Sequence, residues 1–138
     1  MPKFSQSSLS KLNTCDINLQ ILFKEVVKDY DCTVVYGHRE KEKQNKLFDE
    51  GKSKVRYPFS KHNSLPSRAA DVAPYVNGGI SWNLKQCYHF AGYVLGVWNI
   101  LKREHKVEGT LRLGSDWDRD YDINDEEFID VCHFEILY

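Results

Sequence analysis

Two amphipathic helical patterns, separated by short β-branched segments, constrain the fold of this chain more than any other feature. Apolar side chains in residues 19–30 recur with the i, i+3, i+4, i+7 spacing of a helix, which is expected to begin near Thr14 or Asp16. A second and longer stripe predicts a helix over residues 84–105. The members of this stripe are Leu84, Cys87, Tyr88, Ala91, Val94, Leu95, Trp98 and Leu101.

Short apolar, β-branched segments between these helices predict strands. The expected strands span residues 32–36, 69–75, 110–113 and 131–137. A charged helix is expected over residues 40–50 with Gly51 as its stop signal, and residues 52–68 carry two prolines and several serines that predict a loop. The mixture predicts one α+β domain over residues 1–138, with a small, mostly antiparallel sheet packed with helices. The order of the strands does not follow from the pattern.

The 138 residues carry a formal net charge of −1, which hides an uneven distribution of charge. Between residues 38 and 61 there are eight Lys or Arg and four Asp or Glu. Between residues 116 and 135 there are nine acidic residues and one base, Arg119. The basic segment has no known nucleic-acid-binding motif, so no nucleic-acid partner is expected. Acidic residues gathered beside a histidine indicate a cation site.

Apolar stretches are short throughout the chain. They fall far below the roughly 18 residues needed to cross a membrane, and residues 1–6 have no apolar core of a secretory signal. The expectation is therefore a soluble protein made in the cytoplasm, with no membrane insertion. The four cysteines are scattered without a C-x-x-C pair, which favours free buried thiols over a zinc–cysteine site or a disulfide framework. These cysteines are Cys15, Cys32, Cys87 and Cys132.

Two of the five histidines have positions suited to a metal site. His62 lies in the loop before the strand that contains Asp71, and His133 lies in the last expected strand. Two imidazoles and one carboxylate leave a fourth position for water, as in catalytic zinc sites. Asp130, three residues before His133, is the candidate acid/base for the proton of that water. From spacing alone, a structural role for the strand histidine stays open, and the absence of H-E-x-x-H excludes a thermolysin-type peptidase.

Four motifs, in family order, resemble those of the M15 zinc peptidases. The motifs are Ser60-Lys61-His62, Ala69-Ala70-Asp71-Val72-Ala73-Pro74-Tyr75, Gly114-Ser115-Asp116-Trp117-Asp118 and Asp130-Val131-Cys132-His133-Phe134-Glu135. The resemblance covers residues 37–137. It is strongest to the phage L-alanyl-D-glutamate endolysins, which are related to D-alanyl-D-alanine carboxypeptidases and dipeptidases. The resemblance implies the D-Ala-D-Ala carboxypeptidase/Hedgehog-like fold of this family, and we expect a monomer.

Carried over by position, the resemblance assigns three ligands to Zn²⁺, which are His62, Asp71 and His133. It assigns the acid/base role to Asp130. Arg39 matches the family arginine that holds the substrate and stabilises the developing oxyanion, although the residues alone would favour an ordinary surface side chain. Ser60 and Gln44 are further substrate-binding candidates. Glu135 is expected to orient a ligand histidine.

The spacing between the first two ligands departs from the family pattern. Members often read S-x-H-x-x-G-x-A-x-D, whereas His62 and Asp71 are nine positions apart here, with no glycine between them. The cost of closing a loop grows slowly with its length, so the metal site tolerates this difference. The departure concerns the local shape of the substrate groove.

The acidic segment that begins within the third motif is a candidate site for a second cation. Its oxygen-bearing side chains alternate as in part of a Ca²⁺-binding loop, but the central glycine of an EF-hand is missing. Calcium binding and a merely solvated loop therefore both stay open. The candidate side chains are Asp116, Asp118, Asp120, Asp122, Asn124, Asp125, Glu126 and Glu127.

The resemblance implies a zinc-dependent endolysin that hydrolyses the L-alanyl-D-glutamate bond in the peptide stem of bacterial peptidoglycan. Such an enzyme, made in the host cytoplasm without a signal peptide, would reach the wall through holin-dependent release. The basic residues 52–61 would attract the anionic wall polymer. Two alternatives remain: a D,D-carboxypeptidase or D-Ala-D-Ala dipeptidase, and a non-catalytic zinc-binding wall module on the same fold.

Overall fold

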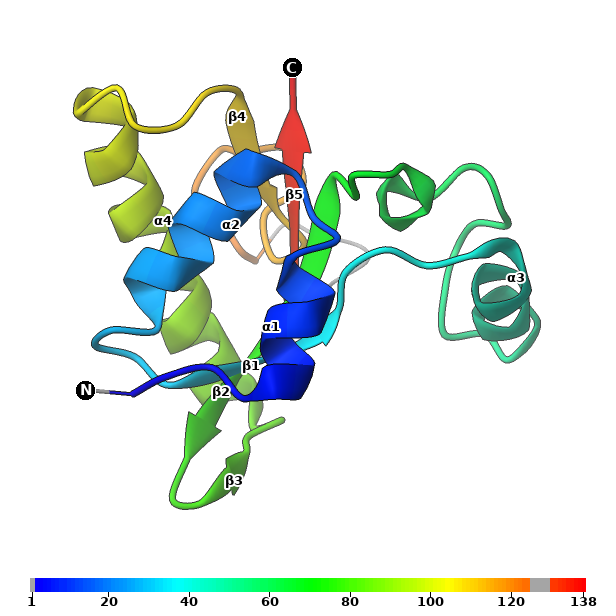
Figure 1. Cartoon of the computed structure of the whole chain (residues 1–138), viewed down its shortest axis with the longest axis horizontal. Helices are drawn as coiled ribbons and strands as arrows, with labels where there is room; N and C mark the ends of the chain where they lie inside the picture. The colour runs from blue at the N-terminus through cyan, green and yellow to red at the C-terminus, as the bar shows by residue number, and fades with distance from the viewer. Residues whose placement is uncertain (1, 125–129) are drawn as a thin grey trace.

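The computed structural model describes residues 2–124 and 130–138, which form one small α+β domain around an antiparallel sheet (Figure 1). The strands are β1 (Cys32–Tyr36), β2 (Ala69–Val76), β3 (Gly79–Ile80), β4 (Thr110–Leu113) and β5 (His133–Leu137). Their order is β1-β2-β5-β4, and β3 pairs with β2 outside this path. Every pairing is antiparallel, which confirms the predicted fold class.

The helices are α1 (Gln6–Leu12), α2 (Ile17–Val26), α3 (Lys41–Asp49) and α4 (Leu84–Arg103), with a short 3₁₀ turn, η1 (Lys61–Asn63). The last three α-helices confirm the sequence prediction, and the Asp16 carboxylate caps α2 by accepting from the Asn18 backbone N–H at 2.8 Å. The first helix was not predicted because its seven residues carry little apolar periodicity. No helix in the described part of the chain is long and apolar enough to span a bilayer.

The main core lies between the sheet and the helices α2 and α4, which lie on the same side of it (Figure 1). Phe134 of β5 packs edge-on against Phe23 of α2 and Phe90 of α4, with ring centroids 5.2 and 6.1 Å apart. The predicted stripe of α4 needs correction at two positions. Leu84, in the first helical turn, is 57% exposed, whereas the unpredicted Phe90 is fully buried. The four cysteines are buried free thiols, as predicted.

Side-chain alternation separates an apolar face of the sheet from a polar one. Ala70, Leu111 and Phe134 belong to the core, while their strand neighbours Asp71 and His133 lie outside it. The polar side chains of the three adjacent strands β2, β5 and β4 therefore share the face opposite α2 and α4. This face carries the candidate site.

Candidate metal centre

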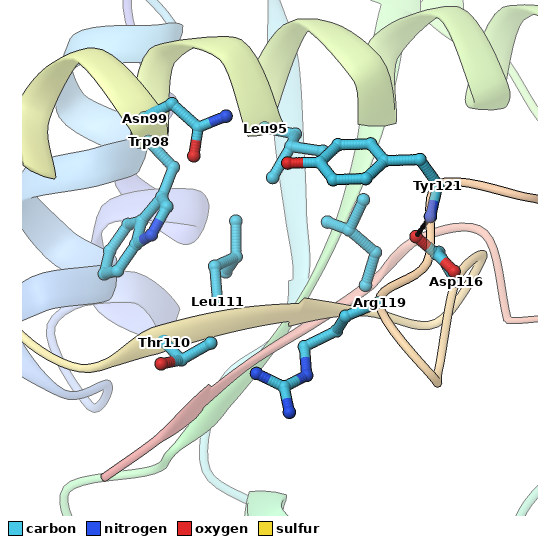
Figure 2. Close-up of a pocket in the computed structure, with 9 residues that line it drawn as sticks. Leu95, Trp98, Asn99, Thr110, Leu111, Asp116, Arg119 and Tyr121 are labelled. Carbon is cyan, nitrogen blue, oxygen red and sulfur yellow. Dashed lines mark hydrogen bonds between the residues drawn. The ribbon is translucent and has the colours of Figure 1, made fainter.

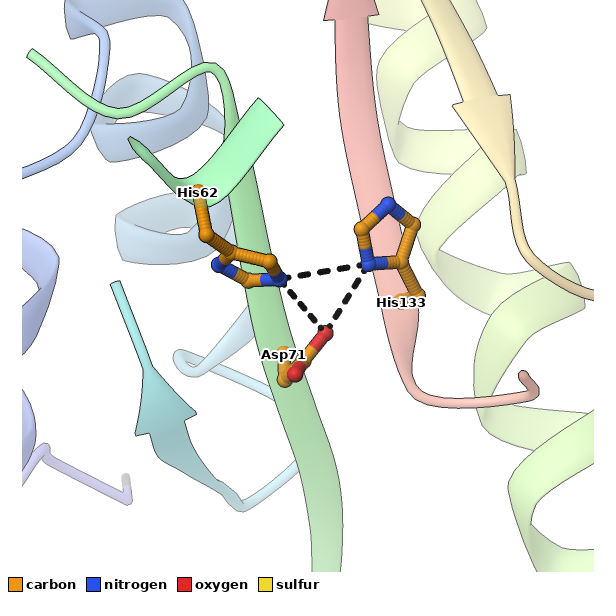
Figure 3. A group of neighbouring side chains, drawn as sticks. All are labelled: His62, Asp71 and His133. Carbon is orange, nitrogen blue, oxygen red and sulfur yellow. Dashed lines mark hydrogen bonds and ion pairs between the residues drawn. The ribbon is translucent and has the colours of Figure 1, made fainter. Parts of the chain in front are cut away.

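The side chains of His62, Asp71 and His133 converge on one point (Figure 3). The Nε2 atom of His62 lies 3.2 Å from Oδ1 of Asp71 and 3.3 Å from Nδ1 of His133. The same Asp71 oxygen lies 3.1 Å from Nδ1 of His133. All three residues are buried. The fold thus brings together the three side chains that the sequence predicted as metal ligands.

Strand register places two of these side chains side by side. Asp71 on β2 is paired directly with His133 on β5, and directly opposed residues have Cβ atoms about 4.5–5.5 Å apart. His62 comes from η1, which is fixed by Ser60, whose hydroxyl accepts from the His62 backbone N–H at 3.1 Å. The His62 carbonyl also accepts from the Arg39 backbone N–H at 2.8 Å. The long spacing from His62 to Asp71 is thus accommodated by a turn with its own capping bonds.

The far side of this loop is anchored to the connection between α1 and α2. Ser67 donates its backbone N–H to the Thr14 carbonyl at 2.8 Å, and its carbonyl accepts from the Asp16 backbone N–H at 2.7 Å. Ser67 is fully buried. These bonds hold the end of the loop next to β2 in place.

Hydrogen bonds on the outer side of each imidazole set which nitrogen faces the centre. Nδ1 of His62 lies 2.8 Å from the Gly37 carbonyl, and Nε2 of His133 lies 2.7 Å from Oε1 of Glu135. Because these partners accept, each neutral ring carries its proton on the outer nitrogen and turns a lone pair toward Asp71. Tetrahedral zinc with bonds of about 2.0–2.2 Å separates its ligand atoms by about 3.3–3.6 Å. The three donor atoms therefore fit a zinc ion in type and orientation, and their separations of 3.1–3.3 Å lie at or just below this range.

The electrostatics of the centre favour a positive charge in it. Burial raises the pKa of Asp71, but the charges and hydrogen bonds of His62 and His133 outweigh burial and hold that pKa far below its ordinary value. Burial lowers the pKa of His133, but hydrogen bonds to Asp71 and Glu135 prevail and raise it to about 9. A proton on an imidazole can supply this positive charge. A divalent cation supplies it while both imidazoles stay neutral.

Arg39 holds the second oxygen of the candidate ligand carboxylate. Its Nη2 donates to Oδ2 of Asp71 at 2.7 Å, and its guanidinium lies over the Tyr36 ring at 4.3 Å. The Nε atom of Arg39 is buried and has no hydrogen-bond partner among the described residues. Arg39 also lines the cleft above the centre. The structure therefore places this predicted substrate-binding residue both against the metal centre and at the cleft.

The cleft beside the centre has a volume of about 290 Å³. Its lining includes Asp130, whose carboxylate accepts no hydrogen bond from the described residues. Burial and the charge of Asp71 raise the pKa of Asp130 above its ordinary value, against the opposing effect of His133, His62 and Arg39. The predicted acid/base is thus a free, partly buried carboxyl group in the same cleft as the candidate ligands.

The position of Asp130 depends on Gly114. The Asp130 backbone N–H donates to the Gly114 carbonyl at 2.9 Å, and a Cβ atom at residue 114 would lie 2.1 Å from the Asp130 carbonyl oxygen. Any side chain at residue 114 would displace one of the two segments. This close approach explains the glycine that opens the third sequence motif.

Glu135 connects the candidate ligand His133 to a residue that sequence reasoning missed. Arg112 on β4 donates Nε and Nη2 to Oε2 of Glu135 at 3.1 and 2.7 Å. Burial raises the pKa of Glu135, but hydrogen bonds from His133 and Arg112 outweigh burial and lower it. Arg112 is the cross-strand neighbour of Glu135, so only knowledge of the strand order could have identified it.

Trp117 is a second residue that sequence reasoning missed as part of the site. Its ring lies 5.3 Å from the His133 ring, and the Arg112 guanidinium lies 5.3 Å from its centroid. It stands in the quoted Gly114–Asp118 motif, which offered the only sequence signal. Trp117 and His133 both line the cleft, where their rings are in contact.

The two other predicted substrate-binding residues have different positions. Ser60 lines the cleft and caps η1. Gln44 is fully buried, and its Nε2 donates to the Ser53 hydroxyl and the Val55 carbonyl, each at 2.8 Å. Ser53 and Val55 line the cleft. Gln44 therefore holds two residues of the cleft wall in place without lining the cleft itself.

Removing the charge of Glu135 is expected to weaken metal binding. In a Glu135→Gln variant, a neutral amide would hold the outer nitrogen of His133 less firmly, and zinc affinity should fall about 10–100-fold. Competition with a chromophoric chelator measures this change, and Glu108→Gln, an exposed site away from the centre, is the matched control. An unchanged zinc affinity in Glu135→Gln would contradict the role given to Glu135.

The acidic loop holds a second group of carboxylates. Asp116, Asp118 and Asp120 each offer an oxygen atom, and these atoms lie within 4.8 Å of one another. Both Asp116 oxygens also accept backbone N–H groups, from Asp120 at 3.3 Å and Tyr121 at 2.8 Å. Asp122 accepts from the backbone of Asn124 outside this group. The remaining predicted calcium candidates, Asp125, Glu126 and Glu127, lie outside the described residues.

Comparisons with known proteins agree with the geometry. The family model described as phage L-alanyl-D-glutamate peptidase matches residues 1–137. A protein named L-alanyl-D-glutamate peptidase, from Escherichia phage T5, is 31% identical over 133 residues, which cover 90% of this chain and 88% of that protein. The crystal structure of Serratia marcescens L-Ala D-Glu endopeptidase ChiX matches with a TM-score of 0.69 at 18% identity, over 99% of this chain and 91% of that chain. At that identity the likeness to ChiX is one of fold.

Proposed function

The chain belongs to the family of phage L-alanyl-D-glutamate peptidases, and from this premise we propose that it is a zinc-dependent endolysin that cleaves the L-alanyl-D-glutamate bond of the peptidoglycan stem. Membership in the family makes it a peptidoglycan endopeptidase. The observation that carries the proposal of zinc is the convergence of three donor atoms within 3.1–3.3 Å of one another. Each imidazole has an acceptor on its outer nitrogen, as metal-binding histidines require.

His62, Asp71 and His133 would hold the ion. Zinc bound there would act as a Lewis acid, which polarises a carbonyl and lowers the pKa of water to about 7. Asp130 accepts the proton of the attacking water and delivers it to the D-glutamate nitrogen as the carbon–nitrogen bond breaks. Arg39 keeps Asp71 in place and sets a positive charge at the cleft wall, near the oxygen on which negative charge develops.

The basic character of one cleft wall supports an anionic substrate. Lys52, Lys54 and Lys61 line the cleft together with Arg112. Peptide stems carry carboxylates, so this wall raises the local concentration of substrate through long-range attraction. The prediction that residues 52–61 attract the wall polymer is thereby supported by their position.

Digestion of purified peptidoglycan, followed by mass spectrometry of the new termini, tests the proposed function. We expect new amino-terminal D-glutamate and carboxy-terminal L-alanine, lost on chelation and restored by zinc. Release of free D-alanine or of D-Ala-D-Ala would instead favour the carboxypeptidase or dipeptidase alternative. Bound zinc without any new termini would favour the non-catalytic wall module.

We propose calcium for the acidic loop because Asp116, Asp118 and Asp120 gather there. Added Ca²⁺ is expected to raise the melting temperature of the zinc-loaded protein, since the cation would relieve repulsion among these carboxylates. The Asp118→Asn variant should lose this response, whereas Asp122→Asn, outside the group, should keep it. A titration that changes neither melting temperature nor activity would show that the loop is merely solvated.

We also propose that the enzyme acts as a monomer on the wall of a bacterial host after holin-dependent release from the cytoplasm. The relative from Escherichia phage T5 supports action in a phage-infected cell. Sedimentation of the purified protein tests the monomer, and loss of lysis in the absence of a holin tests the route of release.

A further inference from the structure

A second cavity, of about 210 Å³, lies on the other side of the edge strand β4, between that strand, α4 and the loop that follows β4 (Figure 2). Its apolar lining consists of Leu95, Leu111 and Leu113, with the Trp98 ring at one end. Its polar lining consists of Asn99, Thr110, Asp116, Arg119 and Tyr121. None of these residues belongs to the lining of the catalytic cleft.

The donors around this cavity lack partners. Trp98 is only 3% exposed, yet none of the described residues accepts a hydrogen bond from its indole N–H, and Figure 2 shows that nitrogen on the side facing Leu111. The Asn99 amide, the Thr110 hydroxyl and the Arg119 guanidinium likewise make no hydrogen bond or ion pair with the described residues. Arg39 Nε is the only fully buried side-chain nitrogen or oxygen without a partner among the described residues, so the indole nitrogen of Trp98 is open to the cavity. Solvent in the cavity can hydrate these donors, and an acceptor on a ligand can replace that solvent.

The arrangement of donors defines the chemistry of that ligand. The indole N–H beside leucine side chains suits a neutral carbonyl that carries a small apolar group, because Asp116 in the same lining disfavours a second carboxylate. An acetamido group has this composition, a carbonyl oxygen next to a methyl group. The rim groups Asn99, Thr110 and Arg119 suit the hydroxyls of a sugar ring, and the Tyr121 side chain is 71% exposed and offers an aromatic face.

We propose that this cavity binds an N-acetylated amino sugar of the glycan strand. The proposal rests on the proposed function, since peptidoglycan joins such sugars to the stem peptide that the cleft would cut. The two sites flank one strand: Arg112 points to the cleft, while Leu111 and Leu113 line the cavity. The following loop contacts both, through Trp117 in the cleft and Tyr121 at the cavity. One polymer can therefore occupy both sites around the exposed edge of β4.

Binding can be measured without catalysis. The chain has three tryptophans, so the indole N–H signals of the ¹⁵N-labelled, zinc-loaded protein are few, and a Trp98→Phe spectrum identifies that of Trp98. We expect tri-N-acetylchitotriose to shift the Trp98 signal in a saturable way. Cellotriose, which has the same linkage but a hydroxyl in place of each acetamido group, should leave it unchanged. No saturable shift with the acetylated trimer, or equal shifts with both, would overturn the proposal.

Kinetics on two substrates test the consequence for catalysis. Asn99→Ala and Arg119→Ala are expected to lower kcat/KM on intact peptidoglycan about two- to tenfold, the effect of one lost hydrogen bond, and to leave kcat/KM on a free stem peptide unchanged. Arg103→Ala is the matched control, because it removes an exposed charge from α4 at a position outside the cavity. Equal losses on both substrates, or no loss on the polymer, would contradict the sugar site. If the parent protein cleaves neither substrate, the proposed function fails, while the spectra still decide on the sugar site.

Discussion

Replacing His133 with Ala is expected to remove both zinc binding and peptidoglycan cleavage. The change deletes one of the three converging donors and leaves Asp71 with a single imidazole beside it. A change to an outer partner such as Glu135 is expected to lower zinc affinity about 10–100-fold. The loss of the ligand His133 itself should lower zinc affinity further. Cleavage should fall to the level of the chelator-treated parent. Metal analysis after dialysis and digestion of purified peptidoglycan measure the two losses.

His89→Ala is the matched control for this substitution. His89 is an exposed histidine of α4 whose ring contacts Tyr30, away from the centre. Its loss should leave zinc content and cleavage at parental values. Circular dichroism shows whether His133→Ala is folded, and a folded His133→Ala protein that retains one zinc per chain would contradict the assigned ligand set.

Asp130→Asn is expected to separate metal binding from catalysis. The amide has nearly the same shape and stays in the cleft, but it cannot accept the proton of the attacking water. Zinc content should be unchanged, and kcat should fall about 10²–10⁴-fold, the usual contribution of a general base. A fully active, zinc-loaded Asp130→Asn protein would show that another group carries the proton.

The pH profile gives an independent check on Asp130. Its pKa lies above the ordinary value, because burial and the charge of Asp71 disfavour the ionised form. Asp130 acts as a base only when ionised, so kcat/KM should decline as the pH falls through this raised pKa. The midpoint of the rising limb of the kcat/KM profile should therefore lie above about 3.9, the pKa of an unperturbed aspartate. This limb should be absent from the pH profile of the residual activity of Asp130→Asn.

The sequence predicted the helices, strands and candidate ligands of this site better than it predicted the contacts between them. Local periodicity located α2, α3 and α4, and the motifs identified His62, Asp71 and His133. Strand order and register depend on contacts between residues far apart in the chain, which no local pattern encodes. The pairing of Arg112 with Glu135 was therefore unpredictable, as was the support that Gln44 gives to the cleft wall.

The structure gives Arg39 a contact that the resemblance did not assign to it. The structure shows its guanidinium bound to Asp71, so a role in holding the metal ligand accompanies its position at the cleft. The helix α1 escaped prediction for a different reason. Its polar residue Ser8 is buried, where its hydroxyl accepts from the Val34 backbone N–H at 3.1 Å, so tertiary contacts outweigh a weak local signal.

The position of β5 in the sheet determines when the candidate site can form during synthesis of the chain. This strand follows β2 and β4 in the sequence, yet it lies between them in the sheet and carries His133. Until residues 133–137 leave the ribosome, β4 has no partner in the sheet and Asp71 faces no second imidazole. Chains that lack residues 133–137 thus lack the proposed metal centre, and we expect the capacity to degrade a wall to arise only when β5 joins β2 and β4.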